Sequence, residues 1–135
     1  MFILNSTIEN DSLPLMETEL CVIRLANDSR YPWVIVVPKV IDAVELHDLT
    51  ETQFQDVMAT IRSIGEAMKS GFDADKINTA AIGNMVSQLH IHIVARFRDD
   101  PNWPGPVWGA GAMVALPEDE IASRTAIIRD SFIGS

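Results

Sequence analysis

The hydrophobic positions of the chain fall into short β-branched runs that polar or proline-containing segments separate. Residues 20–26 (LCVIRLA) and 33–38 (WVIVVP) are two such runs, and they predict two strands. The segment 27–32 between them has turn chemistry, so the pair reads as a hairpin. Residues 77–82 (INTAAI) and 88–96 (QLHIHIVAR) predict a second pair of strands, and Gly83 and Asn84 open the connection between them.

After Thr50 the apolar residues recur with a different period. Thr50 and Gln53 have the spacing of a capping box, which marks the start of a helix. Apolar residues then recur at helical spacing, and they are Phe54, Val57, Met58, Ile61, Ile64 and Met68. The pattern predicts a long amphipathic helix that ends near Gly71, where glycine can adopt a left-handed cap.

The last third of the chain combines a loop with a helix. Residues 99–111 contain too much proline and glycine for regular structure and are expected to form a loop with two tryptophans. Pro117 and the three acidic residues after it suit a helix N-terminus, so a C-terminal helix is expected through about Asp130.

The order of these elements predicts an α+β fold for the whole chain. Hairpin, helix, hairpin, loop and helix follow one another, so an antiparallel sheet of roughly five strands with one long helix and a C-terminal helix is expected. With 135 residues, of which 47% are hydrophobic, the chain is expected to form a single domain over residues 1–135.

Charge narrows the choice of partners. The net charge of -9 and the absence of a Lys/Arg cluster argue against nucleic acid, whereas a small anionic ligand is compatible with a few local donors. The single cysteine, Cys21, lies in an apolar run and is expected to be buried. No apolar stretch approaches the roughly 20 residues of a membrane helix, and no signal peptide is recognised, so a cytoplasmic protein without membrane association is expected.

The segment 88–96 carries the candidate chemistry. Alternate side chains of a strand share a face, so Leu89, Ile91 and Ile93 are expected in the core, while His90 and His92 face the other way. Residues two apart lie about 6.6 Å apart along a strand, from a rise of about 3.3 Å per residue. Two imidazoles at this spacing can contact one phosphate together.

Three interpretations of the pair follow from the spacing alone. One neutral imidazole can attack phosphorus while the other, with an ordinary pKa of about 6.5, donates a proton to the leaving group. A His-x-His pair is also typical of a zinc site. The third interpretation is two partly exposed histidines without chemistry.

The segment resembles the signature of the histidine triad (HIT) family, His-φ-His-φ-His-φ-φ, in which φ is hydrophobic. Gln88 occupies the first histidine position, His90 the second and His92 the third. Residues 83–87 resemble the Gly-Gln-Ser/Thr-Val stretch before the triad, and residues 18–38 resemble the first hairpin of the family. The resemblance covers residues 18–96 and implies a HIT-like fold and a homodimer.

The resemblance also implies roles for these histidines and for Asn84. His90 would be the nucleophile that takes up a nucleotidyl group, and His92 would contact the phosphate or the leaving-group oxygen. Asn84 stands where the family has a glutamine and would hydrogen-bond the phosphate.

Three further candidates for substrate contact come from the same resemblance. Gln88 is one, and its backbone carbonyl would also orient the ring of the nucleophile, as the family's first histidine does. Asn27 and Asp28 fall near the position that binds the ribose hydroxyls.

The implied function is hydrolysis or transfer at the α-phosphate of a purine nucleotide derivative. The expected substrates are a diadenosine polyphosphate or a nucleoside phosphoramidate, with no required cofactor, although Mg²⁺ could accompany a polyphosphate. Because Gln88 replaces a histidine, a nucleotide-binding protein without turnover is the first alternative. A metal site in which His47 or Cys21 joins the two histidines is the second.

Four other side chains have competing interpretations. A solvated strand end is favoured for Arg96 over a phosphate contact, and a surface position is favoured for His47. Trp103 and Trp108 are expected either to stack on a base or to fix the loop onto the body of the protein.

Overall fold

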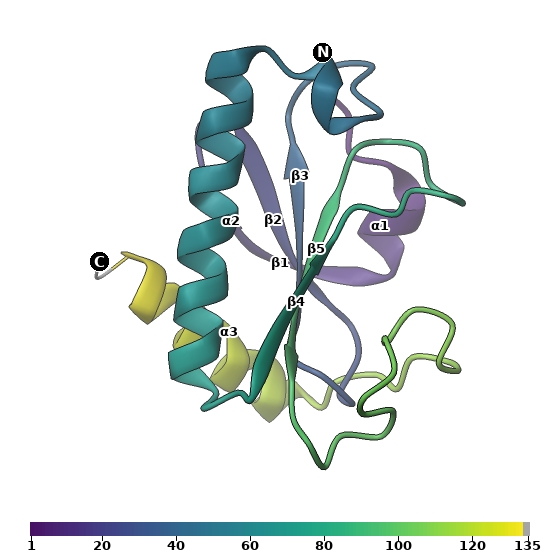
Figure 1. Cartoon of the computed structure of the whole chain (residues 1–135), viewed down its shortest axis with the longest axis vertical. Helices are drawn as coiled ribbons and strands as arrows, with labels where there is room; N and C mark the ends of the chain where they lie inside the picture. Colours follow the sequence, from purple (N-terminus) through teal and green to yellow (C-terminus); the bar gives the residue numbers. More distant parts are fainter. Residues whose placement is uncertain (134–135) are drawn as a thin grey trace.

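The computed structural model describes residues 1–133, and an antiparallel sheet of five strands lies at its centre (Figure 1). Along the sheet the order is β1 (Ser12–Glu17), β2 (Cys21–Ala26), β3 (Trp33–Pro38), β5 (Ile91–Arg96) and β4 (Lys76–Ala80). Every neighbouring pair is antiparallel. The sheet and the helices around it confirm the α+β prediction.

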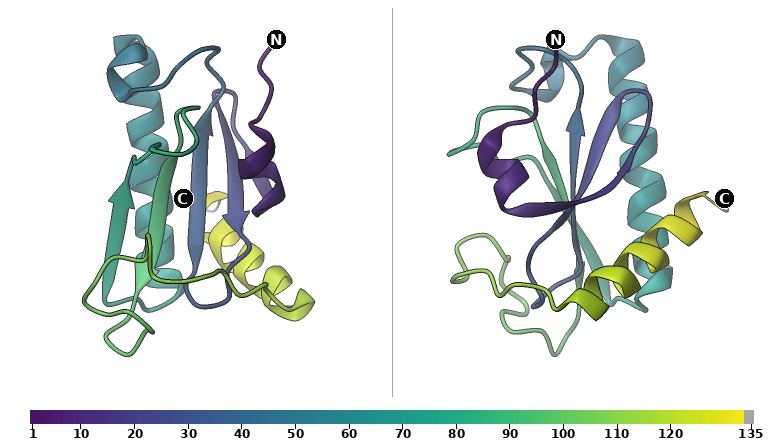
Figure 2. Two further views of the ribbon diagram at one scale, coloured as in Figure 1. Left: turned by 90° about the vertical axis from the view of Figure 1, so that its right-hand side faces the viewer. Right: turned by 180° about the vertical axis from the view of Figure 1, so that it is seen from behind.

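Helices and loops cover both faces of this sheet. The long helix α2 (Glu51–Gly71) and α3 (Glu118–Ile133) lie on one face, and the short helix α1 (Ser6–Asn10) and the loop after β5 lie on the other (Figures 1 and 2). All six residues of β3 and all six of β5 are therefore buried. No helix within residues 1–133 is long and apolar enough to cross a membrane.

The capping box at the start of α2 is confirmed. The Gln53 amide donates to Thr50 Oγ1 at 3.2 Å, and the Thr50 amide donates to Gln53 Oε1 at 2.9 Å. Two details differ from the prediction. Gly71 remains helical and the left-handed residue is Asp73, with φ of 53°. Phe54, in the first turn of the helix, is 39% exposed, so Val57 is the first of the predicted apolar residues to be buried.

The predicted strands are present, but a fifth strand and a short helix escaped the pattern. β1 is an edge strand that contains Pro14 and shifts register between Pro14 and Met16, so its sequence lacks a clean alternation. The short helix α1 instead begins at the cap of Asn5, whose Oδ1 accepts from the Thr7 amide at 2.8 Å.

β5 begins three residues later than predicted. Gln88, Leu89 and His90 precede the strand, and the Leu89 amide donates to Ala43 O at 3.0 Å instead of joining a strand ladder. The alternation of faces nevertheless holds. Leu89, Ile91 and Ile93 pack in the core beneath α2, and the two histidines face the side that carries α1.

Candidate active site

The two histidines meet at the start of β5. His92 pairs with Ile35 of β3 on one side and with Ala80 of β4 on the other, and His90 lies just before the strand. Their ring centroids are 4.9 Å apart, and the rings meet edge to face. Each residue is only 8% exposed, so the pair lies in a largely buried environment. The structure therefore brings both predicted catalytic residues together.

The ring of His90 is held through the backbone. His90 Nδ1 lies 2.7 Å from the carbonyl oxygen of Gln88. A carbonyl can only accept a hydrogen bond, so Nδ1 carries the ring proton and Nε2 keeps its lone pair. This is the contact expected of the backbone at the first triad position, and glutamine supplies it as histidine would.

The ring of His92 is held in the opposite sense by Trp33. Trp33 Nε1 donates to His92 Nδ1 at 3.0 Å. An indole N–H can only donate, so Nδ1 has the lone pair and Nε2 carries the ring proton. Burial and then the neighbouring His90 lower the pKa of His92 to about 4. The expectation of an ordinary pKa near 6.5 is therefore wrong: His92 is neutral at neutral pH, and its Nε2–H is a donor that no described residue uses.

Nε2 of His90 and Nε2 of His92 have no hydrogen-bond partner among the described residues. Among the side chains that the structure describes, the only fully buried nitrogen or oxygen atoms without a partner are Tyr31 Oη and Trp108 Nε1. No described residue bonds Nε2 of His90 or of His92, so these two atoms must reach solvent. The site thus offers one nitrogen lone pair and one N–H donor side by side.

A cavity of about 260 Å³ opens beside His90. Its walls are the segment from Val44 to His47 and the connection before β5, including Gly83, Ser87 and Gln88. His47 is exposed, as expected, but it lies on the rim of this cavity. A wider groove between Pro14 and the α3 helix contains no histidine.

The side chain of Gln88 is occupied within the chain. Gln88 Oε1 accepts from the Asn5 amide at 2.8 Å, and Gln88 Nε2 donates to the Ile3 carbonyl at 2.9 Å. Both polar ends of the side chain thus hold the N-terminal segment. A substrate contact by this side chain stays a prediction, and it would require Gln88 to exchange one of these two bonds for the substrate.

Asn84 lies at the edge of the site. It is exposed on the connection before β5, next to Gly83, which lines the cavity and has a φ of 67°. A phosphate contact by Asn84 stays a prediction.

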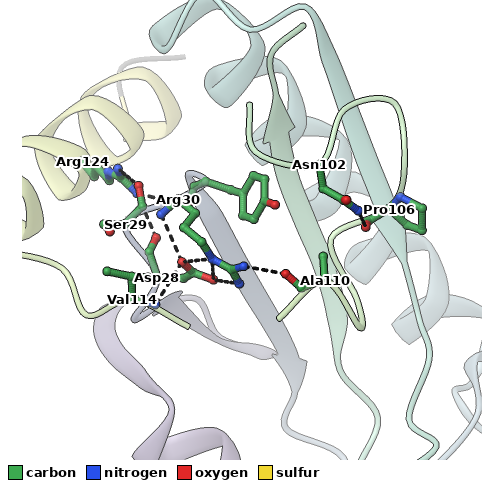
Figure 3. A network of polar contacts seen from close by, with 9 residues as sticks. Asp28, Ser29, Arg30, Asn102, Pro106, Ala110, Val114 and Arg124 are labelled. Atoms are coloured by element: carbon green, nitrogen blue, oxygen red, sulfur yellow. Dashed lines mark hydrogen bonds and ion pairs between the residues drawn. The ribbon is translucent and has the colours of Figure 1, made fainter. Parts of the chain in front are cut away.

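Asn27 and Asp28 lie in the turn between β2 and β3, and Figure 3 shows the polar contacts of Asp28. The Asp28 carboxylate is fully buried and accepts from the Arg30 guanidinium at 2.8 Å, which keeps the pKa of this carboxyl below its ordinary value despite burial. Asn27 Oδ1 accepts from the Leu116 amide at 2.9 Å. In the structure the Asp28 carboxylate bonds Arg30 and the Val114 amide, and a ribose contact by Asn27 or Asp28 stays a prediction.

The same network fixes the loop after β5 to the rest of the protein. Arg30 also donates to the Ala110 carbonyl at 2.8 Å (Figure 3). Arg124 of α3 donates to the backbone carbonyls of Asp28, Ser29 and Tyr31. Two distant segments are thereby attached to one turn.

The tryptophan loop closes over the histidine pair. The Trp108 ring lies 5.5 Å from the His92 ring and 6.2 Å from the Trp33 ring, both edge to face. Trp103 lies farther along and covers Arg96 at 5.8 Å. Both rings pack onto the body of the protein, as the second expectation for them states, and stacking on a base stays a prediction.

Arg96 is the clearest correction among the other candidates. It is 1% exposed and pairs with Asp100 at 2.8 Å, so the solvated strand end is wrong. Its guanidinium donates to Asp100 and to Asn78, and its burial keeps it from the solvent side on which a phosphate would bind.

The arrangement of possible metal ligands bears on the metal-site alternative. No group of three or more His, Cys, Asp or Glu side chains within residues 1–133 has the arrangement of a metal site. Cys21 is fully buried in the core beneath α2, and burial raises the pKa of its thiol to about 11. This packing confirms the structural role expected for the thiol.

Trp33 is the residue beside the two histidines that the sequence did not reveal. It begins an apolar run and there resembles any other core residue. Its role could have been inferred only from its place next to the strand that carries His92. That place depends on the register of β3 against β5, in which Trp33 pairs with Val94.

Known proteins similar to this chain share one family. Residues 7–99 match the family model of the HIT domain. Solved histidine triad proteins from Sinorhizobium meliloti and Marinobacter aquaeolei are each 40% identical, with TM-scores of 0.94 and 0.95 and at least 96% of each chain covered. A bis(5'-adenosyl)-triphosphatase from Saccharomyces cerevisiae is 34% identical over 70 residues, which are 48% of this chain and 34% of that enzyme. The chain belongs to the HIT domain family.

Proposed function

We propose that the protein hydrolyses or transfers a nucleotidyl group at the α-phosphate of a purine nucleotide derivative, with His90 as the nucleophile. The observation that carries this proposal is the hydrogen bond from His90 Nδ1 to the Gln88 carbonyl, which leaves the Nε2 lone pair available at the cavity. An imidazole held in this way can form a covalent intermediate with phosphorus.

The proposed reaction has two steps. In the first, His90 Nε2 attacks the α-phosphorus, a P–N bond forms, and the bond from phosphorus to the leaving group breaks with its electron pair on the leaving group. A polyphosphate oxygen leaves as an anion, whereas the nitrogen of a phosphoramidate takes a proton from water and leaves as ammonia. In the second, water attacks the same phosphorus, the P–N bond breaks, and the mononucleotide is released. The expected substrates are a diadenosine polyphosphate or a nucleoside phosphoramidate, and the yeast relative named above supports the first of these.

The charge of the site bears on how a polyphosphate would bind. The cavity is lined by Glu45 and by no lysine or arginine. A polyphosphate would therefore meet neutral donors, among them His92 Nε2–H and the exposed Asn84 amide, and Mg²⁺ could accompany it. The homodimer that the resemblance implies stays a prediction.

Incubation of the protein with diadenosine triphosphate and, separately, with adenosine phosphoramidate tests the proposal. Chromatography should show release of adenosine monophosphate from at least one substrate, and His90→Ala should lower the rate by about a thousandfold or more. Calorimetric titration with adenosine monophosphate checks that the variant still binds nucleotide. Binding without product in the wild-type protein would contradict the proposal and favour the non-catalytic binder.

A further inference from the structure

The two histidines differ through their partners at Nδ1. A backbone carbonyl faces Nδ1 of His90, and the indole N–H of Trp33 faces Nδ1 of His92. The first partner only accepts and the second only donates. The partner of His92 is a side chain, so a substitution can remove it without altering the backbone that holds the nucleophile.

We propose that Trp33 is a positioning residue that fixes the ring proton of His92 on Nε2. His92 then offers an N–H donor to the oxygen that leaves phosphorus when His90 attacks. The bond between phosphorus and this oxygen breaks with its electron pair on the oxygen, the developing negative charge accepts a hydrogen bond from Nε2–H, and no proton leaves His92. This role rests on the proposed function of His90.

The surroundings of Trp33 prevent its indole from turning away. Trp33 is 7% exposed in β3, next to β5, and the Trp108 ring packs against both Trp33 and His92. An indole packed on both sides keeps its N–H direction, and a fixed donor holds its acceptor in one tautomer.

No other polar group competes for His92 Nδ1. The neighbours of His92 are Trp33 and Ile35 from β3, Ala80 from β4 and Trp108 from the loop, and none of these titrates near neutral pH. The titratable group that acts on His92 is His90. The indole N–H is therefore the determinant of where the ring proton lies.

Nuclear magnetic resonance of the free protein tests this directly. The chain has three histidines, so protein labelled with ¹⁵N-histidine gives three ring patterns, which His47→Gln and His92→Gln assign. Long-range ¹H–¹⁵N correlation at neutral pH should show the wild-type His92 protonated on Nε2 and His90 protonated on Nδ1. A proton on Nδ1 of wild-type His92 would overturn the proposal, whether or not any variant folds.

Trp33→Phe then removes the indole N–H and keeps an aromatic ring in place. Loss of one hydrogen bond should reduce the preference of His92 for the Nε2–H form by about tenfold, so the second tautomer should become visible. Trp108→Phe is the matched control, because its indole N–H has no partner in the structure. The His92 pattern should be unchanged in that control, and an unchanged pattern in Trp33→Phe would overturn the proposal.

Kinetics separate this proposal from the proposed function. With diadenosine triphosphate as the substrate, Trp33→Phe should lower kcat by about tenfold with little change in KM, because the lost donor acts on the leaving oxygen. An altered tautomer with unchanged kcat would refute the catalytic role of the donor. If the wild-type protein turns over no substrate, the proposed function fails while the tautomer measurement still decides how Trp33 acts on His92.

Discussion

At the scale of single residues, identical side chains acquire different chemistry from their partners. His90 and His92 lie two positions apart, yet one ring receives a carbonyl at Nδ1 and the other an indole N–H. The sequence predicted that both rings would share a face, because that follows from the period of a strand. It could not predict the tautomer of His92, since Trp33 lies 59 positions away in the chain.

The buried state of His92 predicts how stability depends on pH. The pKa of His92 is about 4 in the folded protein and near 6.5 when the chain unfolds, so the unfolded chain binds more protons between these values. The contribution of His92 to the free energy of unfolding should therefore be fully present above about pH 6.5 and should be lost as the pH falls toward 4. Between about pH 7 and pH 5 the loss should be about 2 kcal/mol in the free energy of unfolding.

Urea denaturation at several pH values measures this loss. His92→Gln does not titrate and retains an amide oxygen that can accept from Trp33, so its stability should vary less over the same interval. The buried carboxylates Asp28 and Asp100 have lowered pKa values and affect stability mainly at more acidic pH. Equal pH dependence in the wild type and in His92→Gln would contradict the assignment to His92.

At the scale of elements, the sequence predicted the strands and helix ends that short-range interactions determine. The bounds of β3 and the capping box of α2 follow from short-range sequence and were predicted correctly. The edge strand β1 and the helix α1 were missed, since Pro14 breaks the alternation of the first and the second has only five residues. The use of Gln88 was also hidden, because its partners lie 83 and 85 positions away.

The attachment of the N-terminal segment by Gln88 can be tested by hydrogen exchange. Gln88→Ala removes the acceptor of the Asn5 amide, so this amide should exchange up to about tenfold faster. Gln88→Glu keeps an acceptor for Asn5 but loses the donor to the Ile3 carbonyl, so its effect on Asn5 should be smaller. Mass spectrometry or nuclear magnetic resonance can follow this exchange.

The control for this experiment is Gln53, a second glutamine whose side chain accepts a hydrogen bond from a backbone amide. Gln53 accepts from the Thr50 amide at the start of α2, and Gln53→Ala should leave exchange at Asn5 unchanged. Equal exchange at Asn5 in the wild type and in Gln88→Ala would show that Gln88 does not hold the segment.

At the scale of the whole molecule, the sheet separates the larger hydrophobic core from the candidate site. One face packs against α2 and α3 to form the larger core, and the other face carries the histidines beneath the tryptophan loop (Figure 2). Because β3 and β5 are buried on both faces, the rings lie on a rigid support with little freedom to move. This arrangement suits a reaction in which the nucleophile must meet phosphorus in a fixed orientation.

In the proposed reaction, His90 itself forms the bond to phosphorus. Mass spectrometry of protein quenched during incubation with diadenosine triphosphate or adenosine phosphoramidate tests it most directly, with His90→Ala as the control. We predict an acid-labile nucleotidyl group on the peptide that contains His90, formed while mononucleotide is released and absent from the variant. Release of mononucleotide at an undiminished rate by His90→Ala, or a nucleotidyl group on another residue, would contradict the account.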